Sequence, residues 1–218
     1  MSPDRPMTEQ LMSEDSVALP WPQHGPRPIH THITRPVVQQ LVKAGAHTVL
    51  DLGCGNGWFT GALERCGFDV IGVDRDETGL GIGRQHHPGL GLQRLDVMEP
   101  LPAGLAGRFD AVVAIDLIDH VPRPRKLIET AIAALRPGGL LAITSTYHGY
   151  AKNLVLALGG RFDARWDPLR DHGPMKHFSR ATLTSLLGEF ELHEVQFETV
   201  GRIPMFARAM LISAKTSL

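Results

Sequence analysis

Short apolar runs alternate with amphipathic stretches along most of the chain, in the pattern of strands that alternate with helices. Strands are predicted where an apolar run ends at a polar or glycine-containing turn, and helices where apolar residues follow the helical period. The predicted strands are residues 47–52, 68–73, 91–95, 109–115, 140–144, 191–199 and 205–213. The predicted helices are residues 33–44, 58–66, 78–87, 125–135 and 180–187. This alternation favours an α/β domain with a parallel sheet and right-handed crossovers.

The amino-terminal stretch lacks this pattern. Residues 1–28 are rich in proline and sustain no helical or strand period, which predicts a flexible arm. Residues 29–218 are expected to form one domain, since that length allows a well-buried core. Within it, residues 147–178 break the rhythm of strands and helices, and we expect them to be an insertion over one edge of the sheet.

Composition and charge narrow the function classes. The hydrophobic content of 43% and the charged content of 21% are typical of soluble globular proteins. The formal net charge of −1 gives no reason to expect a nucleic-acid partner, since such partners usually require a basic face. No apolar run approaches the roughly 20 residues that span a bilayer, so no membrane partner is expected. Two cysteines do not make a disulfide framework, and a reducing cytoplasm is the expected compartment.

The first predicted strand runs into a glycine-rich turn. In parallel sheets, ligands bind beyond the carboxyl ends of the strands. Gly53, Gly55 and Gly57 allow a ligand to approach the main chain closely there. Dinucleotide sites share such a turn, but their G-x-G-x-x-G fingerprint would put its third glycine at position 58. Trp58 is too bulky for that packing, which disfavours a nicotinamide-dependent oxidoreductase.

Aspartates end three consecutive predicted strands, and a single one of them would indicate only a cap or a solvated acid. Asp51, beside the glycine turn, suits a ligand with an ammonium and a sulfonium but no phosphate. Asp74 follows the turn by roughly 20 residues, the spacing at which an acid accepts from ribose hydroxyls. Asp96 could accept from an adenine amino group, with Val97 against the ring. The Asp74 spacing serves dinucleotides as well, but the three acids and the glycine turn together indicate a ligand site, and Asp51 and Trp58 favour S-adenosylmethionine as its ligand.

Six sequence motifs occur in a familiar order at residues 49–57, 72–74, 96–97, 109–112, 116–121 and 135–140. In order and spacing they resemble the class I S-adenosylmethionine-dependent methyltransferases. The resemblance implies a Rossmann-like, seven-stranded, mostly parallel sheet with helices on both faces and an antiparallel last strand.

The same resemblance implies a set of donor-binding residues. The glycine loop and Asp51 would hold the methionine end, Ile115 would supply a main-chain contact, and Arg75 would flank the adenosine or be solvated. The full set is Asp51, Gly53, Cys54, Gly55, Gly57, Asp74, Arg75, Asp96, Val97 and Ile115.

Candidates for proton transfer follow the fourth predicted strand. Asp116, Asp119 and His120 share one face if a helical turn forms there, and histidine suits proton transfer near neutral pH. The segment is similar to the Glu-x-x-Glu-His segment of ubiquinone-biosynthesis O-methyltransferases, which is implicated in metal binding or catalysis. Both glutamates are replaced by the shorter aspartate here, so a divalent metal is not favoured. Asp119 could instead cap the turn, and His120 could pack under the loop.

The expected insertion begins with a polar and aromatic segment after the fifth predicted strand. Its His148 is a further catalytic candidate or a wall of the acceptor pocket. Related bacterial small-molecule methyltransferases carry a similar Tyr-His-Gly-Tyr-x-Lys-Asn segment and a later His-x-Lys-Phe-x-Ser stretch. Pro174 stands where that later histidine is expected, so His172 or His177 could replace it.

These features favour a methyltransferase that acts on a small-molecule acceptor, with oxygen preferred to nitrogen or carbon. Nucleic-acid amino methyltransferases of related fold carry an Asn/Asp-Pro-Pro-aromatic motif where this chain has Asp-Leu-Ile-Asp at 116–119. A binding protein that retains the donor pocket without transferring methyl groups stays open as an alternative. The protein is expected to be a monomer or a homodimer.

Overall fold

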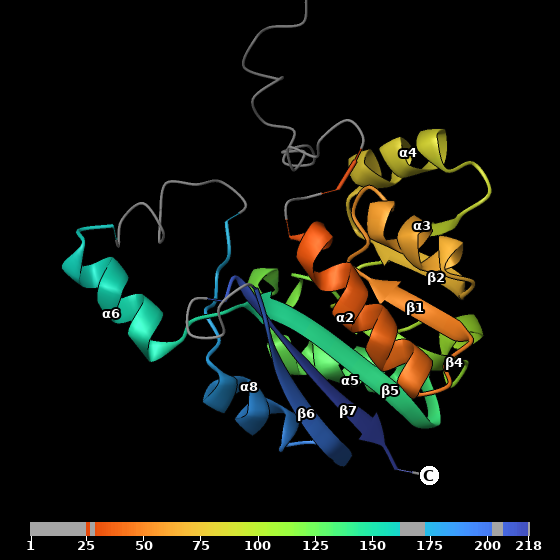
Figure 1. The fold of residues 1–218 in the computed structure, drawn as a ribbon. Helices are drawn as coiled ribbons and strands as arrows, with labels where there is room; N and C mark the ends of the chain where they lie inside the picture. Colours follow the sequence, from red (N-terminus) through yellow and green to blue (C-terminus); the bar gives the residue numbers. More distant parts are fainter. Residues whose placement is uncertain (1–24, 27–28, 162–172, 202–206, 218) are drawn as a thin grey trace, which may run out of the picture.

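The computed structural model describes residues 25–26, 29–161, 173–201 and 207–217, and they form a sheet with helices packed on it (Figure 1). The strands are β1 (Thr48–Leu52), β2 (Asp69–Asp74), β3 (Gly91–Arg94), β4 (Phe109–Ala114), β5 (Leu135–Thr146), β6 (Leu192–Val200) and β7 (Ala209–Thr216). The helices are α2 (His30–Lys43), α3 (Trp58–Arg65), α4 (Glu77–His86), α5 (Pro124–Ala134), α6 (Tyr150–Leu158) and α8 (Arg180–Leu187). Two short 3₁₀ turns are η1 (Ala103–Leu105) and η2 (Ile118–His120).

The sheet has seven strands in the order β3-β2-β1-β4-β5-β7-β6. β1 pairs in parallel with β2 and β4, whereas β7 runs antiparallel to both of its neighbours. The prediction of a mostly parallel sheet with one antiparallel final strand is confirmed. The strand order reverses between β1 and β4, which makes their carboxyl ends the switch point where such sheets bind ligands.

Helices cover both faces of the sheet, as predicted (Figure 1). On one face α2 and α3 contribute to a cluster that includes Ile33, Leu41 and Phe59. On the other face α5 and α8 contribute Leu127 and Leu183 to the larger cluster. The strand β4 lies between these layers and is buried along its whole length. Its apolar sequence follows from burial on both faces.

Several element boundaries differ from the predictions, and one helix was not predicted. α2 begins at His30 and not at residue 33, and it contains Pro36. β5 begins at Leu135 and not at residue 140, so the prediction that Arg136 to Gly139 lie outside the strand was wrong. Leu135 pairs with Phe109 before a register shift, and such a long-range pairing cannot be read from a local Pro-Gly-Gly pattern. α6 was not predicted as a helix.

Some predictions concern residues outside the described ranges. They include nearly all of the amino-terminal arm, residues 162–172 of the expected insertion and the start of the last predicted strand. Within the described ranges, β7 begins at Ala209. No helix there is both long and apolar enough to cross a membrane.

Asp110 lies at the amino-terminal end of β4, opposite the carboxyl ends that form the switch point. Its Oδ2 accepts from the backbone N–H groups of His47 at 2.7 Å and Thr48 at 2.9 Å, and its Oδ1 lies 2.6 Å from a guanidinium nitrogen of Arg136. Burial raises the pKa of Asp110, but these hydrogen bonds and the Arg136 charge outweigh it and hold the pKa below the ordinary value. The carboxylate thus stabilises the turn between α2 and β1.

Asp110→Ala should lower the free energy of unfolding by about 1–3 kcal/mol, because two backbone donors lose their acceptor. The control Arg136→Met removes only a half-exposed ion pair and should cost under about 1 kcal/mol. Because the folded-state pKa is lowered, the wild-type advantage should be present above the ordinary pKa and be lost as the pH falls through the lowered one. Urea unfolding at several pH values measures both effects, and equal stability of Asp110→Ala and wild type would contradict this role.

Candidate active site

The glycine loop after β1 has a backbone that few other residues could adopt. Gly53, Gly55 and Gly57 all have positive φ, at 75°, 56° and 69°. A Cβ on Gly53 would lie only 2.7 Å from Cδ1 of Leu117, and one on Gly57 would lie 2.9 Å from Cδ1 of Leu92. The loop therefore needs glycine for its conformation, and the side chains of Leu117 and Leu92 pack closely against it.

Asp74 holds this loop against the end of β2. Its Oδ2 accepts from the backbone N–H of Gly55 at 2.8 Å, and its Oδ1 accepts from the N–H of Asp76 at 2.8 Å. Burial raises the pKa of Asp74, and the two hydrogen bonds oppose that rise. Each carboxylate oxygen keeps a further lone pair, so the group can still accept from a ribose diol. Sequence reasoning found the position of Asp74 but missed its tie to the loop.

Asp51 lies near the end of β1, where its side chain contacts α3. It is buried, and its Oδ2 accepts from Oγ1 of Thr60 at 2.7 Å. Burial raises the pKa of Asp51 to about 7; the Thr60 hydrogen bond lowers it, and the charge of Asp74 raises it further. Burial also raises the pKa of the neighbouring Cys54 thiol, which therefore stays neutral. Thr60 was missed in the sequence, although it lies in the first turn of the helix that follows the loop.

The predicted adenine-binding residues Asp96 and Val97 follow the end of β3. Oδ1 of Asp96 accepts from the backbone N–H of Met98 at 2.9 Å, so this acid does cap its own turn and has its second oxygen left over. Val97 is buried, and its carbonyl accepts from Oγ1 of Thr130 on α5 at 3.0 Å. Ile115, just beyond β4, is also buried. The turn after β3 is thus fixed to the body of the domain.

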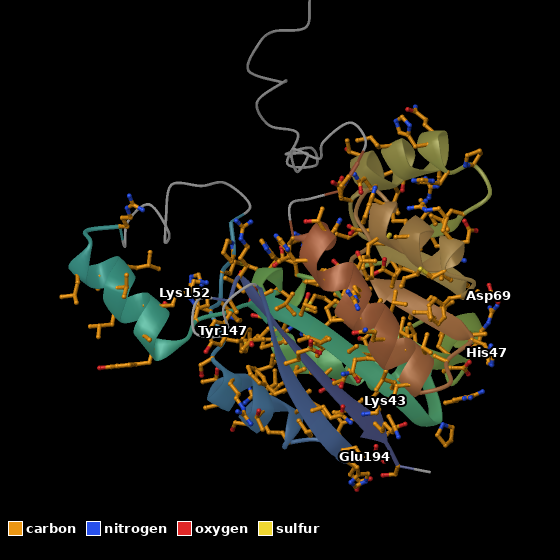
Figure 2. All side chains as sticks on the ribbon, in the orientation of Figure 1. Lys43, His47, Asp69, Tyr147, Lys152 and Glu194 are labelled. Carbon is orange, nitrogen blue, oxygen red and sulfur yellow. The ribbon has the colours of Figure 1, made fainter. Side chains whose placement is uncertain are left out.

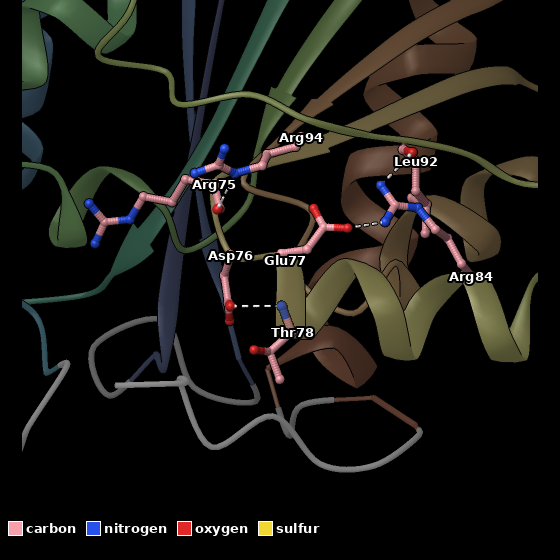
Figure 3. Close-up of polar contacts among 7 residues, drawn as sticks. All are labelled: Arg75, Asp76, Glu77, Thr78, Arg84, Leu92 and Arg94. Carbon is pink, nitrogen blue, oxygen red and sulfur yellow. Dashed lines mark hydrogen bonds and ion pairs between the residues drawn. The ribbon is translucent and has the colours of Figure 1, made fainter. Parts of the chain in front are cut away.

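Arg75 lies at the start of the β2–α4 turn and is exposed. Its carbonyl accepts from Nε of Arg94, and Figure 3 shows its guanidinium pointing away from the acids of the turn. Below it Asp76 caps α4 through the N–H of Thr78, and Glu77 pairs with Arg84 (Figure 3). The two roles considered for Arg75, flanking the adenosine or being solvated, both remain compatible with this placement.

Trp58 is the first residue of α3, and its ring stacks on the ring of His30. The His30 ring lies parallel to it, with centroids 5.3 Å apart and an interplanar angle of 10°. Nδ2 of Asn56 also donates to the carbonyl of Gly25. The chain at Gly25, before α2, therefore lies against the glycine loop.

The turn after β4 begins with a strained residue. Asp116 has φ of 53°, in the left-handed region, and its N–H donates to Oγ1 of Thr144 at 2.9 Å. The helical turn η2 that follows contains Asp119 and His120 but not Asp116. Left-handed non-glycine residues cluster at functional sites, where the surrounding structure holds them.

Asp119 joins three segments on this side of the site. Its carboxylate is buried and accepts from Oγ of Ser145 at 2.7 Å and from the N–H of Thr146 at 3.0 Å. Burial raises the pKa of Asp119 to about 6; the two hydrogen bonds lower it, and the charge of Asp116 raises it. Its carbonyl accepts from the N–H groups of residues 175 and 176. The end of β4, the end of β5 and segment 173–178 therefore meet at Asp119.

Two imidazoles meet beside this junction. Nδ1 of His177 lies 3.3 Å from Nε2 of His148, with the rings edge to face. His177 is one of the two residues expected to replace the missing histidine at Pro174, and His172 lies outside the described residues. Next to His148, Lys152 donates from α6 to the carbonyl of Tyr147 at 2.9 Å (Figure 2).

The expected insertion therefore has two differently packed parts within the described residues. Segment 173–178 lies against η2, whereas α6 stands away from the sheet and buries no residue (Figure 1). Among the residues that the structure describes, no group of three or more His, Cys, Asp or Glu side chains is arranged to hold a metal ion.

Comparison with known proteins agrees with this geometry. Residues 12–196 match the family model described as a methyltransferase domain. The ubiquinone biosynthesis O-methyltransferase of Xylella fastidiosa (strain M23) is 28% identical over 204 residues, which cover 91% of this chain and 82% of that protein. The protein of the same name from Xanthomonas axonopodis pv. citri (strain 306) is 32% identical over 161 residues, or 70% of this chain and 66% of that protein.

Solved structures agree on the fold. Magnesium protoporphyrin IX methyltransferase from Synechocystis, with bound SAH, has a TM-score of 0.63 at 21% identity and covers 85% of this chain and 82% of its own. A SAM-dependent methyltransferase from Thermotoga maritima, described as a possible histamine N-methyltransferase, has a TM-score of 0.63 at 19% identity and covers 82% and 87%. At these identities the similarity establishes the architecture alone.

The residues at the switch point fit S-adenosylmethionine. The glycine loop has positive φ at Gly53, Gly55 and Gly57, and buried acids rather than phosphate-binding groups lie beside it. With residues 12–196 matched to the family model, the chain belongs to the methyltransferase family and is an S-adenosylmethionine-dependent methyltransferase.

Proposed function

We propose that the protein transfers a methyl group to a hydroxyl oxygen of a small organic molecule. The observation that carries this proposal is the pair of imidazoles next to the junction of β4, β5 and segment 173–178. An oxygen nucleophile needs a base, and imidazole is the side chain suited to that task near neutral pH. The curated relatives named as O-methyltransferases of ubiquinone biosynthesis support the same direction.

On the donor side, the residues of this chain would bind and orient S-adenosylmethionine. S-adenosylmethionine, when bound, supplies an electrophilic methyl group on a sulfonium. Asp51 and the glycine loop from Gly53 to Gly57 would hold its methionine end, with Cys54 as an uncharged wall. The residues assigned to the adenosine are Asp74 for the ribose, Asp96 and Val97 for the adenine, Ile115 for a main-chain contact and Arg75 at its flank.

On the acceptor side, four residues have proposed roles. His120 and His148 are the candidates for accepting the hydroxyl proton. Asp116 would supply a negative charge near Asp119, and Asp119 positions the loops through its buried hydrogen bonds. Alignment of this kind can lower a barrier by several kcal/mol. A divalent cation at Asp116, Asp119 and His120 is the disfavoured alternative, because each aspartate is one methylene shorter than the glutamate of the similar segment.

A paired acceptor assay tests the proposal. The protein is incubated with S-adenosylmethionine and either catechol or 1,2-phenylenediamine, which differ only in the nucleophilic atom, and S-adenosylhomocysteine is quantified. We expect turnover with the diol and little with the diamine. Turnover with the diamine alone would favour an N-methyltransferase. Donor binding without turnover on a wider panel of phenols, amines and carbon acids would favour the non-catalytic binding protein.

The raised pKa of Asp51 predicts how donor binding depends on pH. Below about pH 7 the carboxyl group is mostly neutral and must lose its proton to pair with the ligand's ammonium. The affinity for S-adenosylhomocysteine should therefore fall by up to about tenfold for each pH unit below that value. Calorimetry in buffers of different ionisation heat measures the affinity and the released proton together.

Two variants are matched controls for this prediction. Asp51→Asn should bind more weakly and with a flatter pH dependence, because the titrating group is gone. Thr60→Val removes the hydrogen bond that lowers the pKa of Asp51, so its transition should move to higher pH. A wild-type affinity that is constant between pH 5.5 and 8 would remove Asp51 from donor binding.

A further inference from the structure

His148 and His177 come from distant parts of the chain and meet ring to ring. His148 follows β5, and His177 lies three residues before α8, yet Nε2 of the first is 3.3 Å from Nδ1 of the second. The rings are 4.9 Å apart between centroids and inclined at 79°. This geometry lets a nitrogen of one ring lie in the hydrogen-bonding direction of the other.

Both rings are carried by anchored segments. Before His177, the N–H groups of Met175 and Lys176 donate to the carbonyl of Asp119 at 2.8 and 3.0 Å. After it, Phe178 is buried in the larger core cluster, and Ser179 forms a capping box at the start of α8. The contact between the two imidazoles is therefore fixed by packing on either side of His177.

The other ring is anchored as well. The N–H of Tyr147 donates to the carbonyl of Arg208 at 3.1 Å, and Lys152 donates to the carbonyls of Tyr147 and Ala207 (Figure 2). These contacts tie the chain around His148 to the β5–β7 edge. Side chains held in this way can keep the geometry that proton transfer needs.

Two neutral imidazoles joined by a hydrogen bond carry two N–H protons in total. Each ring carries one N–H, and one of the two protons lies between the facing nitrogens. If Nε2 of His148 donates, then Nδ1 of His148 carries no proton, and if Nδ1 of His177 donates, then Nε2 of His177 carries no proton. In either arrangement one outer nitrogen of the pair is free of a proton and can accept one.

We propose that His148 and His177 act as one proton-accepting unit for the hydroxyl acceptor; this assignment rests on the proposed O-methyl transfer. As the acceptor oxygen forms its bond to the methyl carbon, the O–H bond breaks and the proton passes to the outer nitrogen that carries no proton. The carbon–sulfur bond breaks with its electron pair left on sulfur. The pair then holds one extra proton, shared through a charge-assisted hydrogen bond, and releases it to water after the methylated product leaves.

This assignment separates the roles of the two candidate bases. His148 becomes the proton acceptor together with His177, which the sequence indicated only as a replacement for the histidine missing at Pro174. His120, on η2, then contributes to the acceptor pocket without taking the proton. The proposal therefore makes opposite predictions for substitutions at positions 120 and 177.

The test uses catechol methylation by the full-length protein. His148→Ala and His177→Ala should each lower kcat by about 10²–10⁴-fold. The double variant should be no slower than the slower single variant, because residues that act as a unit are non-additive. Added imidazole should restore turnover in His177→Ala in proportion to its concentration. Donor affinity and melting temperature, measured in parallel, should match those of the wild type.

His193→Ala is the matched control, since it removes an exposed imidazole on β6, and it should leave kcat unchanged. Multiplicative losses in the double variant, a raised KM with unchanged kcat, or no rescue by imidazole would each overturn the proposal. Loss of turnover in His120→Ala with normal turnover in His177→Ala would also overturn it while leaving O-methyl transfer intact. Absence of catechol turnover in the wild type with turnover of an amine would instead refute the proposed function itself.

Discussion

Gly53→Val is expected to reduce the affinity for S-adenosylhomocysteine by at least about 100-fold, a loss near 2.7 kcal/mol of binding free energy. The added Cβ would lie 2.7 Å from a methyl group of Leu117, and φ at this position is 75°. The Leu117 side chain or the loop must shift, and the strained φ favours a shift of the loop, which would disturb its hydrogen bonds to the end of β2. Titration calorimetry at constant pH measures the loss.

Gly45→Val is the control for backbone strain alone. Gly45 also has a positive φ, of 66°, but a Cβ there would meet nothing within 4 Å, and the residue follows α2 at the other edge of the sheet. Both variants should lose about 1–2 kcal/mol of stability, the cost of a left-handed non-glycine residue. Only Gly53→Val should lose donor affinity. If both bind the ligand as the wild type does, the glycine loop is not the donor site.

Asp74→Ala should weaken donor binding by a factor comparable to that of Gly53→Val, because Asp74 has two roles at the site. It removes the acceptor for the N–H of Gly55 and, by the proposed assignment, the partner of the ribose. Because both functions belong to one carboxylate, this variant alone would not separate them. Its combination with Gly53→Val should be less than additive, since both substitutions release the same loop.

The grouping of the candidate acids at one end of the sheet could be predicted because strand ends follow from local sequence. Each apolar run that ends at Asp51, Asp74 or Asp96 is a local pattern, and parallel strands bring such ends to one edge. The sequence could not predict what these acids touch. Asp74 binds an N–H 19 residues away, and Asp51 binds the hydroxyl of Thr60 on the following helix.

The acceptor side was less predictable because its contacts join segments far apart in the chain. Asp119 binds Ser145 across 26 residues, and His148 meets His177 across 29. No local period encodes such pairs. The helix α6 was missed for a related reason: its apolar residues are exposed, so its composition did not give the one-sided pattern that marks a helix packed on a sheet.

Asp119→Ala should lower turnover by about 100-fold while leaving donor affinity unchanged, because a displacement of roughly 1 Å at a catalytic group has an effect of that size. The substitution leaves the hydroxyl of Ser145 and the N–H of Thr146 without their acceptor, and it should also lower the free energy of unfolding by about 1–3 kcal/mol. Steady-state kinetics with catechol and urea unfolding measure the two losses.

Asp119→Asn distinguishes a positioning role from a role for the charge. Its amide oxygen can accept from the N–H of Thr146, and its amide nitrogen can donate to Oγ of Ser145, whose hydroxyl is free to rotate. Burial raises the pKa of Asp119 to about 6, so the site already disfavours the charged form and should tolerate a neutral amide. We therefore expect Asp119→Asn to retain turnover within about tenfold of the wild type. If it is as slow as Asp119→Ala, the carboxylate charge itself acts in catalysis, and the interpretation of Asp119 as a positioning residue is wrong.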